Sequence, residues 1–166
     1  GQPLPETQAA VDAAEAVQPS TVAAPPREKL KIAILELDYL NRMGNDDPMG
    51  KMISEFLTTA AVNTGAFNIA EREQLAKVLK ELELNQTGII DEGEAREIGR
   101  MVGAEAILTG SVSRVGNSMR IDARFIDVES GNIIAANEQI IPNCNDIQAI
   151  STGAKNIMHM LVAKLP

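Results

Sequence analysis

The predicted strand over residues 104–115 restricts the fold more than any other segment of this chain. At Ala106, Ile107 and Leu108 this segment shows no alternation between apolar and polar residues. Such a pattern is typical of a strand in the centre of a sheet that is buried on both faces. The chain is therefore predicted to place other elements against both faces of this strand.

The remaining segments supply those elements and predict one mixed sheet covered by helices. Short or alternating apolar runs predict four further strands, over residues 30–37, 66–70, 119–125 and 132–141. Helical spacing of apolar residues predicts four helices, over residues 48–63, 72–82, 92–102 and 147–165. The polar segment 38–48 is predicted to be a loop. The expected fold class is α/β (α+β), with about five strands in the order β-α-β-α-α-β-β-β-α, a parallel pair first and an antiparallel meander last.

Residues 1–28 differ in composition from the rest and are predicted to form a disordered, Pro/Ala-rich tether to a domain over residues 29–166. Five of the eight prolines lie in this stretch, and large apolar residues are too few to offset the entropy of ordering it. A leader of this kind follows the lipidated cysteine of many bacterial lipoproteins. A generic disordered N-terminus explains the composition equally well.

The composition excludes several classes of function. The formal net charge is −8 and the pI is about 4.7, so phosphate backbones repel the chain and nucleic acid is not an expected partner. No apolar run approaches the roughly 20 residues that a membrane-spanning helix needs. The single cysteine, Cys144, allows neither an intrachain disulfide nor a cysteine-built metal site.

No set of residues has catalytic, metal-ligating or cofactor-binding spacing, so no cofactor is expected and the chain is predicted not to be an enzyme. Residues 44–51 resemble a phosphate-binding loop, but the glycines are one residue too far apart and Met52 replaces the hydroxyl residue. The only histidine, His159, is expected to face solvent, and Cys144 lacks a basic neighbour that would activate it. Pairs of carboxylates that come together only on folding are left as an open alternative for catalysis. One group of acidic residues is better explained by capping of the helix over 92–102 than by calcium binding. It consists of Asp91, Glu92, Glu94 and Glu97.

Three stretches of the chain carry a family resemblance. They are residues 67–75 with 78–81 and Gly88, Gly99 with residues 103–112, and residues 124–133. Together they resemble the CsgG-like family of curli production assembly/transport lipoproteins and their periplasmic relatives. Related domains occur in lipoprotein activators of penicillin-binding proteins and in flagellar accessory proteins. The resemblance extends over nearly all of residues 30–165.

The motif positions are expected to act as scaffold, because each has a local physical role. Glu71 suits the positive end of a helix, and Arg72 is placed to reach a neighbouring carboxylate. Gly103 releases a helix into the buried strand, Gly110 allows close approach over the sheet, and residues 127–131 form a turn. The full set of these positions is Glu71, Arg72, Gly88, Gly99, Gly103, Gly110, Asp127 and Gly131.

This chain lacks the segments with which pore-forming members of the family span a membrane. Such hairpins need about 9–11 residues in each strand, whereas the longest connection here, residues 38–48, is polar. The resemblance therefore implies the soluble periplasmic domain alone. It also implies an outer-membrane-associated location, with membrane contact only through a lost N-terminal lipid anchor.

The expected function is that of a non-enzymatic accessory lipoprotein of the cell envelope. It would bind another envelope protein in secretion, assembly or the regulation of cell-wall synthases. Two alternatives stay open: a soluble subunit of a ring-forming curli-type secretion assembly, and a small-ligand-binding protein. The expected partners are envelope proteins, and homo-oligomerisation is left open.

Overall fold

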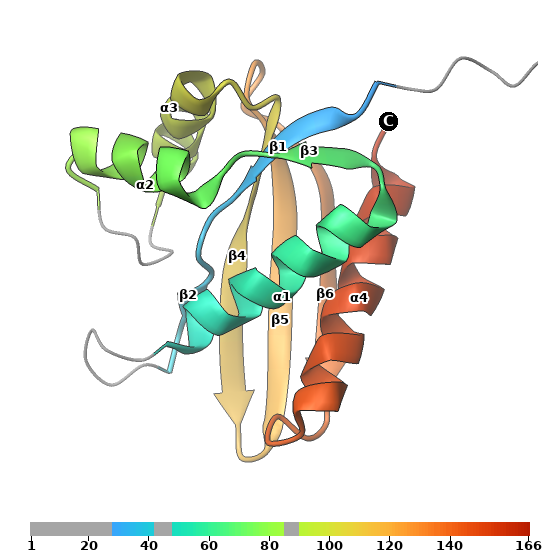
Figure 1. Cartoon of the computed structure of the whole chain (residues 1–166). Helices are drawn as coiled ribbons and strands as arrows, with labels where there is room; N and C mark the ends of the chain where they lie inside the picture. Colours follow the sequence, from blue (N-terminus) through green and yellow to red (C-terminus); the bar gives the residue numbers. More distant parts are fainter. Residues whose placement is uncertain (1–27, 42–47, 85–89) are drawn as a thin grey trace, which may run out of the picture.

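The computed structural model describes residues 28–41, 48–84 and 90–166 (Figure 1). The predicted tether and Gly88 lie outside these residues, apart from residue 28, so the division into tether and domain stays a prediction. The elements follow in the order β1 (Leu30–Ile34), β2 (Asp38–Tyr39), α1 (Met49–Thr64), β3 (Phe67–Ile69), α2 (Arg72–Glu81), α3 (Glu92–Val102), β4 (Ala106–Val115), β5 (Ser118–Asp127), β6 (Ile133–Ile141) and α4 (Ile147–Lys164).

The strands form one mixed sheet, which confirms the expected fold class. The strand order is β3-β1-β4-β5-β6, with β2 also paired to β4. The pairs β1–β3, β1–β4 and β2–β4 are parallel, whereas β4–β5 and β5–β6 are antiparallel. The predicted parallel opening and antiparallel meander are both present.

The prediction of a single strand over 30–37 is wrong, and the predicted loop over 38–48 begins with a short strand at Asp38–Tyr39, whereas residues 42–47 of that loop lie outside the described residues. The structure divides this stretch into β1 and β2, so the described sheet has six strands rather than about five. Ile34 pairs with Leu108 and Asp38 pairs with Ser111. The segment from β1 to β2 therefore advances four residues where β4 advances three, so it contains one extra residue. An extra residue of this kind leaves one position out of the ladder, as in a β-bulge.

Ser54 of α1 stabilises this interruption between β1 and β2. Its hydroxyl oxygen accepts the Leu37 amide at 2.9 Å, and the hydroxyl lies 3.2 Å from the Leu35 carbonyl and 2.7 Å from the Gly50 carbonyl. At Gly50 a Cβ atom would lie 2.0 Å from the Leu37 carbonyl oxygen, so only glycine lets α1 approach this closely. The helix therefore supplies the hydrogen bonds that the sheet does not.

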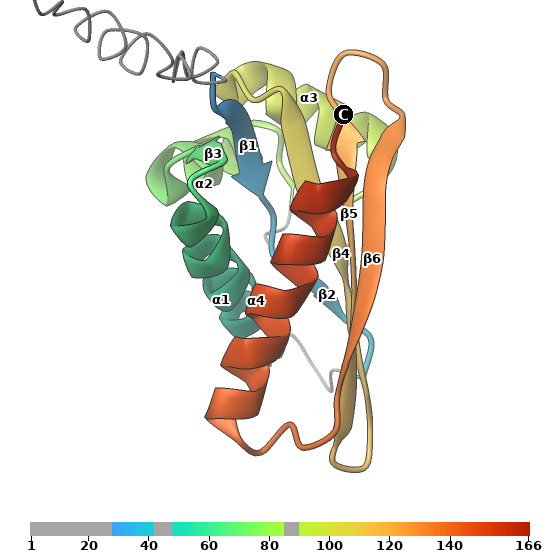
Figure 2. The ribbon, with the colours of Figure 1, turned by 90° about the vertical axis from the view of Figure 1, so that its right-hand side faces the viewer.

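Two apolar clusters lie on opposite faces of the sheet. Figure 2 shows α1 and α4 side by side on one face, where Leu108 and Phe125 are fully buried. The other cluster joins α2 and α3 to Ile107 and Ile126. The neighbours Ile107 and Leu108 thus belong to different clusters, which confirms that the start of β4 is buried on both faces.

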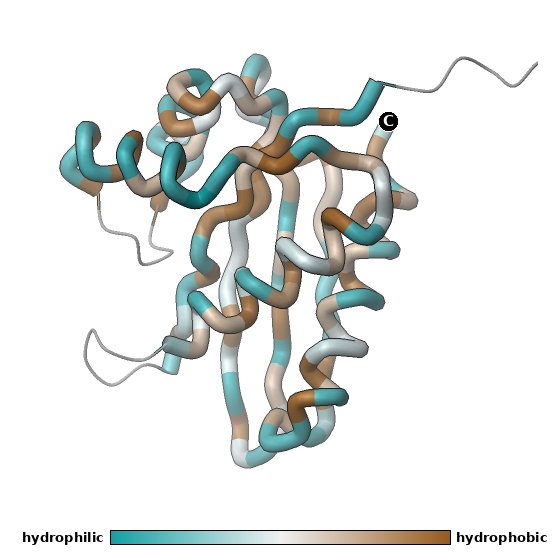
Figure 3. The backbone as a smooth tube through the Cα atoms, viewed as in Figure 1, coloured by the Kyte–Doolittle hydropathy of each residue, from teal (hydrophilic) through white to brown (hydrophobic). Residues whose placement is uncertain are grey.

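Among the described residues, none of the helices combines the length and the apolar character that crossing a membrane requires. The antiparallel strands alternate between hydrophilic and hydrophobic residues along their length, as the colours of Figure 3 show. This alternation agrees with the prediction of a half-buried strand around residues 119–125, which the structure extends to Ser118–Asp127.

Gly110 provides a test of how tightly β4 and β5 are packed. A Cβ atom at this position would lie 1.9 Å from the backbone oxygen of Asp122, so the backbone itself would have to move. We expect Gly110→Ala to lower the free energy of unfolding by about 3 kcal/mol, measured by urea-induced unfolding.

Gly93 is the matched control for this variant. It lies exposed near the start of α3, where the nearest atom to an added Cβ atom is 3.4 Å away. We expect Gly93→Ala to leave the free energy of unfolding unchanged or to raise it by up to about 1 kcal/mol. Equal stability of the two variants would contradict the tight packing at Gly110.

Candidate functional site

A pocket of about 160 Å³ opens at the carboxyl ends of β1 and β3, between α1 and α2. The residues that line it come from the ends of the two strands, from one side of each helix, and from a position two residues before α3. They are Ile34, Leu35, Glu36, Lys51, Ser54, Thr58, Ile69, Ala70, Arg72, Leu75, Ala76, Leu79 and Ile90.

The topology explains why a pocket forms at this place. The neighbouring parallel strands β1 and β3 lead into helices that pack on opposite faces of the sheet, α1 on one and α2 on the other. Where adjacent strands send their helices to opposite faces, a crevice opens at their carboxyl ends, and ligands of open α/β sheets bind in such crevices. The pocket is therefore the position that this fold class favours for a small ligand.

The inside of the pocket is apolar. Its wall consists mainly of aliphatic side chains, and the lining includes no aromatic residue. The two hydroxyl groups of the lining are already engaged: Ser54 bonds to carbonyls of its own surroundings, and the Thr58 hydroxyl donates to the Ser54 carbonyl at 2.8 Å. The interior accordingly favours a hydrocarbon group.

Charged groups gather at the mouth of the pocket. Burial raises the pKa of Glu36 above its ordinary value, and the positive charges of Lys51 and Arg72 oppose this rise without cancelling it. Arg72 forms an ion pair with Glu55 of α1, which joins the start of α2 to α1. Among the described residues, the side chains of Glu36 and Lys51 form neither a hydrogen bond nor a direct ion pair.

The motif positions do not gather at this pocket, since Arg72 is the one of the eight that lines it. Glu71 precedes α2 at its N-cap without a side-chain hydrogen bond to the helix. Gly103 ends α3 in the left-handed conformation, with φ of 72°. At Gly99 a Cβ atom would lie 2.4 Å from the Val128 side chain, so this glycine lets α3 lie close to the residue that follows β5.

Asp127 and Gly131 belong to the turn between β5 and β6. The Asp127 carboxylate accepts the Ser130 hydroxyl at 2.7 Å and the Ser130 amide at 2.8 Å, and these two bonds lower the pKa of Asp127. Arg96 of α3 donates to the carbonyls of Val128 at 3.1 Å and Glu129 at 2.6 Å. These contacts explain the motif positions as structural, and a functional role for them is untested.

The other sequence candidates have structural explanations. Asp91 and Glu94 form a reciprocal capping box at the start of α3, which confirms capping for that pair. His159 is exposed as expected, whereas Cys144 is buried. Within the described ranges, the side chains of His, Cys, Asp and Glu do not gather into a group of three or more that suits a metal ion. Of the loop-like segment 44–51, residues 42–47 are not described, and Lys51 lies at the pocket mouth.

A second surface lies where the helices stop covering the sheet. The α2/α3 cluster reaches β4 and β5 only at Ile107, Ile126 and Val128, and Figure 2 shows α3 beside the upper part of the sheet alone. Beyond that point the same face presents side chains to solvent, and we refer to it as the uncovered sheet face. It consists of Ser111, Ser113, Val115, Arg120, Asp122, Arg124, Ala136, Glu138 and Ile140, together with Asp38 of β2, which pairs with Ser111, and Leu40 after β2.

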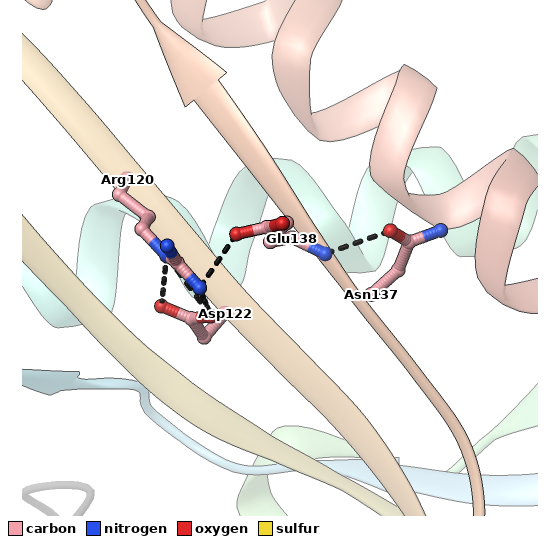
Figure 4. A network of polar contacts seen from close by, with 4 residues as sticks. All are labelled: Arg120, Asp122, Asn137 and Glu138. Carbon is pink, nitrogen blue, oxygen red and sulfur yellow. Dashed lines mark hydrogen bonds and ion pairs between the residues drawn. The ribbon is translucent and has the colours of Figure 1, made fainter.

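An ion-pair network lies on the uncovered sheet face (Figure 4). Arg120 contacts the Asp122 carboxylate at 2.9 Å and the Glu138 carboxylate at 2.5 Å, and these acids, Asp122 foremost, raise the pKa of Arg120. The Glu138 amide, on the edge strand β6, donates to the Asn137 side chain at 2.8 Å. Within the described ranges Arg124 has no ion pair, so it is the unneutralised cation of this face.

Comparison with known proteins identifies the family. A family model described as curli production assembly/transport component CsgG matches residues 13–120, about two thirds of the chain. The chain belongs to the CsgG family. No protein of curated function matches it.

Solved structures of three proteins share the fold of this CsgG-family chain. The C-terminal domain of LpoB from Salmonella enterica has a TM-score of 0.56 and 21% identity, over 77% of this chain and 90% of that one. The PelC dodecamer from Paraburkholderia phytofirmans has a TM-score of 0.53 and 12% identity, over 82% and 88%. Lipoprotein GNA1162 from Neisseria meningitidis has a TM-score of 0.53 and 13% identity, over 70% and 83%. At these identities the likeness concerns the fold.

The sequence analysis of this CsgG-family chain missed Glu36 and Lys51. The available signal was Glu36 itself, a lone acid between two leucines in a segment predicted to be a strand. Lys51 lies in the predicted helix over 48–63, and its resemblance to the lysine of a phosphate-binding loop was rejected on spacing. The pocket depends on bringing β1, α1, β3 and α2 together, and no local pattern indicates that arrangement.

The raised pKa of Glu36 predicts how one substitution changes stability with pH. A raised pKa means that the folded protein binds this proton more readily than the unfolded chain, so the charged form costs stability as the pH rises above the ordinary value of 4.5. We expect Glu36→Gln to raise the urea midpoint at pH 7. The gain should shrink as the pH falls toward 4.5 and be absent below it, where Glu36 is protonated in both the folded and the unfolded state.

Glu97→Gln is the control, because it removes the same charge from an exposed position in α3. We expect the urea midpoint to change less for this variant than for Glu36→Gln at pH 7. A lower midpoint for Glu36→Gln at pH 7 would show that attraction to Lys51 and Arg72 outweighs the cost of burial.

Proposed function

We propose that this CsgG-family chain is a non-enzymatic accessory protein of the bacterial cell envelope, which binds another envelope protein through its uncovered sheet face. Membership of the CsgG family supports an envelope role, and one protein of the same fold is itself described as a lipoprotein. The proposed location is the periplasm, in association with the outer membrane.

The observation that carries this proposal is the composition of the uncovered sheet face. Leu40, Val115 and Ile140 are exposed by 61%, 82% and 58%, although strand alternation elsewhere places such residues in the core. They surround the Arg120 network and the unpaired Arg124. Exposed aliphatic side chains around charged groups are typical of surfaces that bind other proteins.

The chemistry of this face predicts the complementary partner. Asp122 and Glu138 both contact Arg120, whereas Arg124 forms no ion pair among the described residues, so a carboxylate on the partner can pair with Arg124. Apolar side chains of the partner would cover Leu40 and Ile140. The partner is therefore proposed to present an acidic group flanked by apolar residues.

Residues 1–28 are proposed to act as a tether to a lipid anchor at the outer membrane. A flexible coil of this length spans about 28 Å and would raise the local concentration of the domain near its partner. The process that the partner serves is proposed to be secretion, assembly or the regulation of cell-wall synthases.

A ring-forming assembly is the second candidate, because PelC of the same fold is described as a dodecamer. Sedimentation velocity at low and high protein concentration separates the two candidates. We expect one species with the monomer mass of 17.8 kDa at both concentrations. A concentration-dependent shift to a closed ring of high mass would contradict the proposal and favour the assembly.

Two substitutions test the uncovered sheet face. Arg124→Glu and Ile140→Asp remove a positive charge and an exposed aliphatic side chain without breaking a described ion pair. Each is expected to weaken binding at least tenfold, because residues that anchor an interface cost more than about 1.4 kcal/mol when removed. The partner is first identified by cross-linking in envelope extracts, and its affinity is then measured by calorimetry with purified proteins.

Lys155→Glu and Val62→Asp are the matched controls. Lys155 is an exposed cation on α4, and Val62 is an exposed aliphatic residue on α1, both on the helices of the opposite face. We expect both controls to bind the partner as the unmodified chain does. Equal losses in the two pairs of variants would exclude the uncovered sheet face as the binding surface.

A further inference from the structure

We propose that the pocket between α1 and α2 binds a free aliphatic α-amino acid of about the size of leucine. Its side chain would occupy the apolar interior, its ammonium group would bind Glu36, and its carboxylate would bind Lys51. This site is separate from the uncovered sheet face and does not depend on the protein-binding role proposed above.

The apolar interior determines the class of side chain. Ile34, Ile69, Leu75, Leu79 and Ile90 contribute to the wall. Since the Ser54 and Thr58 hydroxyls already bond to backbone carbonyls, a polar group inside would lose its hydrogen bonds to water without full replacement. Sugars and other polyhydroxylated ligands are therefore disfavoured.

The volume of the pocket limits the size of the ligand. Pockets for drug-sized molecules measure about 300–1,000 Å³. This pocket measures about 160 Å³, which is below that range. A branched side chain of four or five carbon atoms matches such a space, and nucleotides or acyl chains of lipids exceed it.

The charges at the mouth determine the head group. Glu36 and Lys51 line the same pocket and interact electrostatically. Among the described residues, their side chains form no direct ion pair with each other and no hydrogen bond. Arg72 is already neutralised by Glu55. One unpaired anion and one unpaired cation beside an apolar cavity are complementary to a zwitterion that carries a hydrocarbon side chain.

The position of Glu36 is held rigidly, as a binding group requires. Its neighbours Leu35 and Leu37 are exposed by only 1% and 2%, and each belongs to a different apolar cluster. The Leu35 amide donates to the Leu108 carbonyl at 3.0 Å, and the Leu37 amide donates to Ser54. The interruption between β1 and β2 thus fixes the backbone on both sides of Glu36, which places this residue at the pocket.

The test is a titration of the ¹⁵N-labelled full chain, followed by amide chemical shifts, with four small probes. L-Leucine carries all three recognised groups, leucinamide lacks the carboxylate, 4-methylpentanoate lacks the ammonium group, and glycine lacks the side chain. We expect saturable shifts with leucine, centred on residues 34–36, 51–58 and 72–79. Each of the other three probes should bind at least tenfold more weakly.

Three variants examine the residues directly. Glu36→Gln and Lys51→Met should each weaken leucine binding at least tenfold, and Ala76→Phe should abolish it by filling the pocket. Lys155→Met, which removes a cation from exposed α4, should leave the affinity unchanged. Thermal unfolding of each variant verifies that it is folded before the titration.

Several results would overturn the proposal. They are the absence of saturable shifts with leucine, equal affinity for leucine and 4-methylpentanoate or leucinamide, or unchanged affinity of Glu36→Gln. The uncovered-face variants Arg124→Glu and Ile140→Asp should bind leucine normally. The two proposals can therefore fail separately. Absence of leucine binding would not contradict binding of a protein at the uncovered sheet face, and absence of protein binding there would not contradict leucine binding in the pocket.

Discussion

The burial of β4 on both of its faces is the constraint on which the rest of the structure depends. Ile107 and Leu108 are adjacent residues with no exposed surface, and each contributes to a different apolar cluster. A strand of this kind is stable only when helices cover both faces of its sheet. The pair α1 and α4 satisfies one face, and the pair α2 and α3 satisfies the other.

The second face is covered only in part, and both candidate surfaces follow from this. The helices α2 and α3 are short and pack near β1 and the start of β4, so the antiparallel half of the sheet extends beyond them (Figure 2). The pocket opens where α1 and α2 diverge to opposite faces, and the uncovered sheet face begins where α3 ends. One surface suits a small apolar zwitterion, and the other suits a protein.

The interruption between β1 and β2 connects packing to chemistry. Gly50 allows the start of α1 to lie against the Leu37 carbonyl, and Ser54 supplies the hydrogen bonds that the extra residue removes from the ladder. The same arrangement holds a carboxylate, Glu36, beside an apolar cavity. The interruption that shapes the scaffold of this chain is thus also the feature that brings a carboxylate to the pocket.

The sequence by itself determined the order of the long elements, because apolar spacing reports directly which side of a helix or strand is buried. The helix at Glu92–Val102 matches its predicted bounds, and the meander of β4, β5 and β6 was predicted from alternation and turn residues. Only the tertiary structure decided the division of the first strand, since that depends on the register against β4 and on a serine from a distant helix. It alone also decided the position of Glu36 at the pocket and the extent of the uncovered sheet face. Both depend on where helices end above strands remote in sequence, which is a property of three-dimensional packing that no local pattern contains.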